Sequence, residues 1–568
     1  MKYVSTLLFF VLAALCVAQK TALPADVVSN IQQRIDQGIN PAIAIGIFDA
    51  DGEHYYNFGL TKTGGRPVDE HSIFEIGSIT KTFTAILLAD MVEKGKLNLD
   101  DPISKFLPAT VTVPYRADAQ ITLGHLSDHT SSLPRMPDNM TPADPLNPYA
   151  DYTVEQMYAF LSSYTLTRDI GSEYEYSNFA QGLLGHILSL QAGMSYEDLM
   201  LATIASPLKM SETGITLSDN MRKHLATPHS QGIEVSNWDL PTLAGAGAIR
   251  SSTSDMLKYL AANLGLTESR LTNPMQMTYQ ARHDKAGMRV GLAWHIRDGA
   301  EGDVIWHNGG TGGYRAFAGF VKETGRGVVL FTNSDIGVDD IGFHLLDSNS
   351  ELQTIRPHVA RELRKHIDSE GVNGVEAKFA ELKQAGAEKY DFSEMDINAL
   401  GYYYLQLKNV DAALAIFKIN TIEYPGSANV WDSFGEALME KGETAAAIEN
   451  YQKSLVLNPG NTNAVAMLEK LGIAASIPEI QVSEDILQTY LGNYELMPGF
   501  SIVVTHDGAQ LYGQATGQAK FELFPKTETE FYLKVVDAQI KFNKNDVGVV
   551  ESLTLFQGGQ VLEGKKSL

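Results

Sequence analysis

Cysteine is almost absent from this sequence, which has one, Cys16, among its 568 residues. Cys16 lies inside an apolar N-terminal stretch that we expect to be removed, so the mature chain would contain no cysteine. Disulfide bonds, thiol chemistry and cysteine-based metal sites are therefore excluded. We expect neither a metal ion nor an organic cofactor.

Basic side chains are scarce relative to acidic ones. Lysine and arginine number 44 against 68 aspartates and glutamates, a formal net charge of −24. Nucleic acids and anionic membranes attract basic surfaces, so neither is expected as a partner. Hydrophobic residues make up 44% of the chain and charged residues 20%, which is typical of globular folding. The length allows about three or four domains.

Long apolar runs are absent after the N-terminus, so no transmembrane span is predicted. At the N-terminus, Lys2 precedes the apolar segment 7–17, and Ala18 supplies a small residue for cleavage. This pattern predicts a signal peptide at residues 1–18 and export to the periplasm or the extracellular space. Leu15 is a poor fit to a lipoprotein signal, so lipid attachment at Cys16 is not expected.

Strand patterns flank a helical middle in residues 19–344. Two strands are predicted around the turn Asp51-Gly52, and strands return near residue 290, ending in a hairpin around Thr324-Gly325. The economical assembly is one antiparallel sheet built from both ends with helices packed on it, an α/β (α+β) domain. The proline-rich loop 130–152 is long enough to border a site.

An internal repeat follows a charged helical segment, residues 345–390, which is predicted to be a linker. Within residues 391–475, matching residues recur at an offset of 34, the period of the tetratricopeptide repeat (TPR), which this segment resembles. The pairs are Gly401 and Gly435, Ala413 and Ala447, Phe417 and Tyr451, and Pro425-Gly426 and Pro459-Gly460. Two units are fewer than the three usually needed for independent stability. The segment is either a spacer or a groove for a peptide or protein partner.

Short strands with aromatic residues and glycines fill residues 483–568. They predict a small antiparallel β-sheet or barrel. Barrels of this size can hold a small ligand, although a core filled by side chains is the more common arrangement.

Ser78 stands three residues before Lys81, ahead of a predicted helix. Residues three apart share a helix face, so the amine can reach the hydroxyl and act as its base. The pattern is weak alone, because Ser206 and Lys209 repeat it without a following apolar stripe. We interpret that second copy as structural.

The order of three motifs makes the first copy informative. Ser78 and Lys81 are followed by Tyr176-Ser177-Asn178 and then by His307-Asn308-Gly309. This series resembles the serine β-lactamase and penicillin-binding-protein superfamily, with S-x-x-K, Y-x-N and H-x-G in that order. The surrounding blocks resemble its class C-like branch of β-lactamases, esterases and D-stereospecific peptidases. The resemblance covers about residues 25–340.

The resemblance implies a role for each motif residue. Ser78 would be the acylating nucleophile, Lys81 would hold or take its proton, and Tyr176 would share acid and base work through a phenolate-like oxygen. Asn178 would orient Lys81 and the substrate amide. At the third motif, His307 would face the leaving group or a substrate carboxylate. Gly309 and Gly310 would allow close backbone approach, and the Gly310 N–H would join that of Ser78 in the oxyanion hole.

Two departures shape the functional hypothesis. His307 replaces the lysine with which β-lactamases usually bind the antibiotic carboxylate, and Ser132 replaces a glycine in the block His129 to Leu133. We predict an exported serine hydrolase acting through an acyl-enzyme on esters or on D-amino-acid peptides and amides. The alternatives are a β-lactamase or penicillin-binding DD-peptidase, and an inactive binding module using the TPR and β domains.

Overall fold

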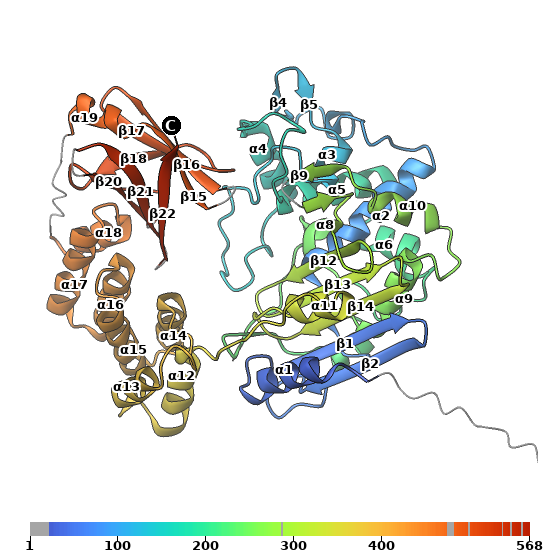
Figure 1. The fold of residues 1–568 in the computed structure, drawn as a ribbon, viewed down its shortest axis with the longest axis horizontal. Helices are drawn as coiled ribbons and strands as arrows, with labels where there is room; N and C mark the ends of the chain where they lie inside the picture. The colour runs from blue at the N-terminus through green and yellow to red at the C-terminus, as the bar shows by residue number, and fades with distance from the viewer. Residues whose placement is uncertain are drawn as a thin grey trace, which may run out of the picture. The chain divides into compact units, whose positions relative to one another are not determined.

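A computed structural model describes residues 22–285, 288–473, 482–497, 500–536, 538–545, 548–557 and 560–567. The predicted signal peptide, with Cys16, lies outside the described residues. The chain forms two compact units, Met1–Gln353 and Thr354–Leu568 (Figure 1). Among the described residues, no helix has the length and apolar character needed to cross a membrane.

The first unit contains an eight-stranded antiparallel sheet in the order β2-β1-β14-β13-β12-β11-β10-β9. β1 pairs with β14, for example Ile45 with Leu330, and so joins the N-terminal hairpin to the late strands. The predicted sheet built from both ends, with its two hairpins, is confirmed. The strands are β1 (Ala42–Asp49), β2 (Gly52–Gly59), β9 (His283–Lys285), β10 (Met288–Val290), β11 (His295–Arg297), β12 (Val304–Gly310), β13 (Arg315–Val321) and β14 (Arg326–Thr332).

Alternating side chains of β1 enter two apolar layers, one on each face of the sheet. Ile43 and Ile45 pack with α1 and α11, whereas Ala44 packs in the larger core with α2 and α9. α9 lies close to the sheet, since a Cβ added at Gly46 would be 2.9 Å from Leu257 Cγ. The four helices are α1 (Ala25–Asp36), α2 (Thr80–Glu93), α9 (Thr253–Asn263) and α11 (Asp339–Leu346).

Helices and long connections make up the middle of the first unit. The loop 130–152 contains no helix or strand, in line with its proline content. The helices are α3 (Leu123–Ser127), α4 (Val154–Ser163), α5 (Asn178–Ala192), α6 (Tyr196–Met200), α7 (Asp219–His224), α8 (Ala244–Gly247) and α10 (Thr272–Thr278), with single turns η1 (Gly77–Ile79), η2 (Ile103–Lys105) and η3 (Leu201–Ala205). Three short strand pairs join β3 (Phe74–Glu75) to β8 (Arg250–Ser251), β4 (Tyr115–Arg116) to β5 (Ala119–Gln120), and β6 (His229–Ser230) to β7 (Ile233–Glu234).

The second unit begins with consecutive helices. α12 and α13, in the segment predicted to be a linker, share one apolar core with α14 and α15, in which Leu363 and Phe379 meet Ile416. Gly401 faces Phe417 and Gly435 faces Tyr451, so the two later helix pairs pack alike. The helices are α12 (Val359–Glu370), α13 (Val375–Ala385), α14 (Glu394–Gln406), α15 (Val410–Glu423), α16 (Ala428–Lys441), α17 (Thr444–Leu457) and α18 (Thr462–Lys470).

The C-terminal strands close into an eight-stranded barrel, because β15 pairs with both β16 and β22. This confirms the barrel among the predicted β arrangements. A short helix, α19 (Glu484–Thr489), precedes it. The strands are β15 (Gly492–Met497), β16 (Phe500–Asp507), β17 (Gln510–Ala515), β18 (Phe521–Pro525), β19 (Glu530–Tyr532), β20 (Ala538–Lys544), β21 (Val550–Gln557) and β22 (Gln560–Ser567).

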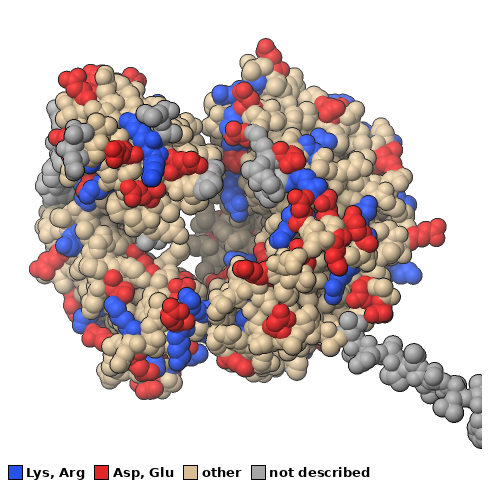
Figure 2. Space-filling view, in the orientation of Figure 1, with Lys and Arg blue, Asp and Glu red and all other residues tan. Residues whose placement is uncertain are grey.

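Charged side chains of both signs are interspersed over the face shown in Figure 2, with uncharged areas between them. Acidic residues outnumber basic ones by 68 to 44 in the whole chain.

Candidate active site

Ser78 lies in the single turn η1, directly before helix α2, and its side chain is only partly buried. Gly77 takes a left-handed conformation, with φ of 50°. A Cβ there would be 2.6 Å from the backbone nitrogen of Gly310, so only glycine lets this turn lie against the end of β12. Local geometry therefore holds Ser78 at the edge of the large sheet.

Lys81 lies one turn further on and is fully buried. Its Nζ is 2.8 Å from Ser78 Oγ, and it donates to Asn178 Oδ1 at 2.8 Å and to the Ala246 carbonyl oxygen at 2.7 Å. Burial, with the nearby guanidinium of Arg135, lowers the pKa of Lys81 well below its usual value. The predicted contacts of Lys81 with Ser78 and Asn178 are both present.

Tyr176 lies above the lysine, with its ring centroid 4.8 Å from Lys81 Nζ. The ring stacks on His129 at 4.6 Å. Ser177 caps α5, because its side chain accepts a hydrogen bond from the Ala180 N–H. Its own backbone N–H donates to His129 Nδ1 at 3.1 Å. The middle motif is thus fixed by a helix cap and a histidine.

Burial raises the pKa of Tyr176 to about 12, although its hydrogen bond to Ser78 and the charge of Arg135 act in the opposite direction. The phenol is therefore protonated at neutral pH. The family resemblance implies a phenolate-like oxygen that shares acid and base work, and this environment favours the proton-donating form of Tyr176.

His307, Gly309 and Gly310 occupy the end of β12, on the strand beside the nucleophile. A Cβ added at Gly309 would be 1.9 Å from the Ile76 carbonyl oxygen and 3.1 Å from the backbone nitrogen of Ser78. The predicted close backbone approach is therefore observed. His307 itself is fully buried beneath the site.

His307 belongs to a group of three buried histidines, with His129 and His295. The rings of His295 and His307 are 5.0 Å apart, and Tyr174 Oη is 2.9 Å from His295 Nε2. Burial lowers the pKa of all three imidazoles, that of His295 to about 4. The three histidines are therefore neutral, and they place no fixed positive charge at the floor of the site.

Arg135, from the loop 130–152, supplies the cation at the mouth of the site. Its guanidinium lies 5.0 Å from the centroid of the Tyr176 ring and its side chain is exposed. Within the described part of the chain it makes no ion pair with a carboxylate. A positive charge is thus available to a substrate beside Tyr176.

A narrow cleft of about 30 Å³ opens beside Ser78. Its apolar walls include Tyr149 and Trp238, whose rings meet edge to face at 5.1 Å. The Trp238 indole N–H donates to the Leu146 carbonyl oxygen at 3.1 Å. The loop predicted to border a site therefore does so. The other lining residues are Asn178, Leu240, Leu243, Ala246, Gly247, Gly310 and Thr311.

Buried polar contacts support the segment that leads to Ser78. Glu75 accepts from the Trp238 N–H at 3.0 Å, from Asn237 Nδ2 at 2.9 Å and from an Arg250 nitrogen at 3.1 Å. Burial raises the pKa of Glu75. Glu75 therefore connects the strand before the nucleophile to the cleft wall at Trp238.

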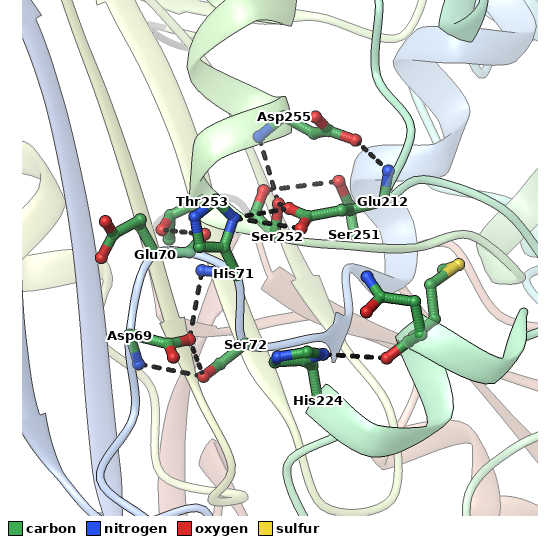
Figure 3. A network of polar contacts seen from close by, with 12 residues as sticks. Asp69, Glu70, His71, Ser72, Glu212, His224, Ser251, Ser252, Thr253 and Asp255 are labelled. Atoms are coloured by element: carbon green, nitrogen blue, oxygen red, sulfur yellow. Dashed lines mark hydrogen bonds and ion pairs between the residues drawn. The ribbon is translucent and has the colours of Figure 1, made fainter.

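A second polar network anchors the start of the same segment (Figure 3). His71 contacts Glu212 at 3.0 Å, and Ser252 Oγ donates to Glu212 at 2.7 Å. The Glu212 N–H donates to Asp255 in α9 at 2.6 Å. These contacts connect the chain before β3 to the sheet-covering helix, and so help to place Ser78.

Ser132 explains how the block His129 to Leu133 tolerates the loss of its usual glycine. Its φ of 63° is left-handed, a conformation that favours glycine. Its hydroxyl donates to the Arg168 carbonyl oxygen at 2.9 Å and accepts from the Arg168 N–H at 3.1 Å. Two hydrogen bonds offset the backbone strain.

Sequence reasoning missed several residues that surround Ser78: Glu75, His129, Arg135, Tyr149, Trp238 and His295. They are separate in sequence and converge only through the fold. Arg135 and Tyr149 carried one usable signal, their place in the long loop predicted to border a site. His129 carried another signal, its place at the start of the block His129 to Leu133. His295 carried none, because an isolated histidine in a strand is most often a core residue.

Comparison with known proteins agrees with this geometry. Residues 27–344 match the beta-lactamase family, and residues 477–566 match a domain of unknown function, DUF3471. The chain is 29% identical to the D-alanyl-D-alanine-carboxypeptidase/endopeptidase AmpH of Escherichia coli strain K12, over 58% of this chain and 94% of that protein. It is 28% identical to a beta-lactamase of Pseudomonas fluorescens, over 54% and 94%.

The fold is shared with a solved class C beta-lactamase, at a TM-score of 0.51 and 23% identity over 58% of this chain and 97% of that one. The family match spans more than half of the 568 residues and contains every residue of the site described above. With a serine, a buried lysine and a tyrosine meeting at the sheet edge, the chain belongs to the beta-lactamase family of serine hydrolases.

Proposed function

We propose that this hydrolase forms an acyl-enzyme on Ser78 and cleaves D-amino-acid peptides or amides, or the related esters. Lys81 takes the Ser78 proton as Oγ bonds to the substrate carbonyl carbon. As the C–N or C–O bond breaks, Tyr176 gives its phenolic proton to the leaving group and regains one from Lys81. Water then attacks the acyl carbon, releases the acid and returns a proton to Ser78.

The contacts of Lys81 carry this proposal. A neutral amine has two N–H groups and one lone pair. The carbonyl oxygens of Asn178 and Ala246 accept both N–H groups, which leaves the lone pair directed at Ser78 Oγ, 2.8 Å away. Because burial favours the neutral amine, Lys81 is prepared as the base.

The oxyanion would be held by the backbone N–H groups of Ser78 and Gly310. Both residues line the cleft, and the glycines at 77 and 309 allow the two backbones to approach closely. Fixed N–H donors of this kind stabilise the charge that develops on the carbonyl oxygen.

Arg135 supports a substrate that carries a carboxylate near the scissile bond. His307 is buried and neutral, so it is unsuited to the carboxylate-binding role suggested by the motif. Arg135 offers the positive charge at the mouth instead. The narrow apolar cleft suits a small acyl substituent such as the methyl group of D-alanine. The name of the AmpH relative, a D-alanyl-D-alanine-carboxypeptidase/endopeptidase, fits this choice.

The remaining parts of the proposal concern location and partners. We infer export to the periplasm or the extracellular space through the N-terminal segment 1–18, because its sequence has signal-peptide character. We also infer that α14 to α17 are two TPR units, supported by the offset of 34 residues and by the matched packing of Gly401 on Phe417 and Gly435 on Tyr451. Their concave face would take a peptide or protein partner.

A fluorophosphonate probe tests the nucleophile. Wild type and Ser206→Ala should be labelled equally, and Ser78→Ala should not be labelled. Equal labelling of Ser78→Ala, or none of wild type, would contradict an acyl-enzyme on Ser78.

A substrate panel tests the substrate class. D-Alanyl-D-alanine peptides, their C-terminal amides, p-nitrophenyl esters and nitrocefin are compared with purified mature chain. Arg135→Gln should raise KM about three- to fivefold for the carboxylate peptide and leave the amide unchanged, as expected for loss of one exposed charge pair. Rapid nitrocefin turnover would favour a β-lactamase, and equal KM changes on both peptides would remove Arg135 from carboxylate binding.

A further inference from the structure

One side of the cleft beside the nucleophile is bordered by a short loop, residues 143–151, which has structure of its own. The Ala143 N–H donates to the Asp151 carboxylate at 2.8 Å, so the two ends of the loop are joined. Inside the loop, the Asn147 N–H donates to the Asp144 carbonyl oxygen at 3.1 Å. A compact surface loop whose ends lie close together can move as one piece over a site.

Three hydrogen bonds attach this loop to the cleft wall at Trp238 and Asp239. The Trp238 indole N–H donates to the Leu146 carbonyl oxygen at 3.1 Å. The Asn147 side chain meets Asp239 twice, because its oxygen accepts from the Asp239 N–H at 2.8 Å and its nitrogen donates to the Asp239 carboxylate at 3.1 Å. We call this pair the latch. All three hydrogen bonds are exposed to solvent, so they open at a low cost in free energy.

The wall itself is held by buried groups. The Trp238 N–H donates to Glu75 at 3.0 Å, and the Trp238 carbonyl oxygen accepts from Arg250 at 2.8 Å. Both partners are buried. The indole also lies against the connection between β12 and β13, since a Cβ added at Gly312 would be 2.7 Å from the indole nitrogen. Of the two sides of the cleft, the loop is therefore the one that can move.

The closed position of the loop limits what the cleft can hold. Tyr149 of the loop meets Trp238 edge to face at 5.1 Å, and a volume of about 30 Å³ remains beside Ser78. That is room for a methyl group, whereas a cavity that binds a benzene ring is about 150 Å³. A larger acyl group can therefore reach Ser78 when the loop lifts and takes Tyr149 away from Trp238.

We propose that residues 143–151 form a lid over the acyl cleft, and that the latch of Asn147 on Asp239 sets the size of acyl group that the enzyme accepts. A methyl-sized acyl group reacts with the lid closed. A bulkier one reacts from the open state, so its rate follows the fraction of molecules that are open. Asn147 and Asp239 are positioning residues, because they act on the cleft through the place of Tyr149. The inference rests on the proposed acylation of Ser78 and adds to it the residues that select the substrate.

A cycle of four proteins tests the latch: wild type, Asn147→Asp, Asp239→Asn and the double variant. Asn147→Asp places two carboxylates against each other and should release the lid. The double variant restores both hydrogen bonds, because the new carboxylate accepts from the backbone N–H of residue 239 and from the new amide beside it. Asp239→Asn removes the charge that lies 3.3 Å from Arg250 but keeps an oxygen for the Asn147 amide, so it is the matched control.

Two esters with the same leaving group measure the acyl size, p-nitrophenyl acetate and p-nitrophenyl 3-phenylpropanoate. Asn147→Asp should raise kcat/KM for the phenylpropanoate about tenfold and change that for the acetate less than about twofold, the scale of one or two lost hydrogen bonds. The ratio of the two values should return to within about twofold of wild type in the double variant and in Asp239→Asn. An unchanged ratio in Asn147→Asp, equal changes on both esters, or a raised ratio that the double variant does not restore would overturn the proposal.

Hydrogen exchange gives a measurement that does not depend on activity. The Asp239 N–H donates to the Asn147 side chain, so it is protected while the latch is closed. By mass spectrometry, a peptide spanning Trp238 and Asp239 should exchange about tenfold faster in Asn147→Asp and at the wild-type rate in the double variant. Equal exchange in all four proteins would contradict the latch.

Ser78→Ala separates the lid from the proposed function. If Ser78→Ala loses both ester activities and the ratio does not move in the latch series, the lid is wrong and the nucleophile stands. If Ser78→Ala hydrolyses both esters at the wild-type rate, the proposed function is wrong, and the exchange experiment still decides whether the latch opens as described.

Discussion

Two segments of the first unit carry a serine three residues before a lysine. Their lysines differ in burial, in side-chain contacts and in backbone conformation. Ser78 and Lys81 lie at the start of a buried helix, where Lys81 has no exposed surface and contacts Ser78, Asn178 and Ala246. Ser206 and Lys209 lie on an exposed turn, and Lys209 adopts a left-handed φ of 58°.

The difference shows what the pattern needs in order to become a nucleophile. Spacing alone brings the two side chains near each other on a helix, as it can at any such sequence. Burial removes the charge of the amine, and two fixed carbonyl oxygens orient its lone pair. The environment around the lysine, supplied by α5 and α8, is therefore the functional part of the motif.

The largest expected effect comes from exchanging each lysine for methionine. Lys81→Met removes the base, so kcat should fall about a thousandfold or more, whereas Lys209→Met should leave kcat unchanged. Single-turnover acylation with a p-nitrophenyl ester measures the change. Comparable losses in both variants would show that the buried environment does not distinguish the two copies.

Tyr176→Phe should have a smaller effect on the same step. The phenol is protonated at neutral pH because burial raises the pKa of Tyr176 to about 12. Its loss should slow kcat for amides by roughly a hundredfold, the scale of general acid catalysis. An activated ester with a good leaving group needs no proton and should be affected much less. Equal losses on both substrates would argue for a role in positioning only.

The pKa of Lys81 also predicts how stability depends on pH. The folded-state pKa lies well below the unfolded value, so between the two the unfolded chain binds the extra proton. Wild-type stability therefore rises with pH in this window, and the contribution is lost as pH falls through the folded pKa. Lys81→Met lacks it.

The free energy of unfolding of wild type minus that of Lys81→Met should therefore increase with pH, by at most about 1.4 kcal/mol per pH unit. Urea unfolding of both proteins at several pH values between 7 and 9 measures this difference. A flat or falling difference would mean that Lys81 remains charged in the folded protein.

Much of this arrangement could be predicted from sequence, and the limits have physical causes. The turns Asp51-Gly52 and Thr324-Gly325 carry local sequence signals, so the hairpins and the sheet could be predicted. The order of Ser78, Tyr176 and His307 identified the site because motif order is itself a sequence property. The burial of His307 could not be predicted from sequence, because it depends on contacts with His295 in the neighbouring strand and with Tyr176.

The position of Arg135 at the site could not be predicted from sequence either. Its contact with the Tyr176 ring joins a loop without helix or strand to the residue before a helix cap, and no periodic pattern records such a contact. The cavity of about 590 Å³ in the C-terminal barrel is similar, because strand alternation predicts inward residues but not whether they fill the space. Volume is a property of the packed structure.

The smallest expected effect concerns the exposed copy of the motif. Lys209 holds a left-handed φ of 58°, which costs a residue with a Cβ roughly 1–2 kcal/mol. Glycine avoids that cost but loses about 0.5–1 kcal/mol through the greater freedom of the unfolded chain. The backbone bonds of Lys209 to Ser206 and Lys258 do not involve its side chain. Lys209→Gly should therefore raise the free energy of unfolding by about 0.5 kcal/mol with kcat unchanged, measured by urea unfolding. A loss of stability together with a loss of activity would mean that the second lysine does more than complete a turn.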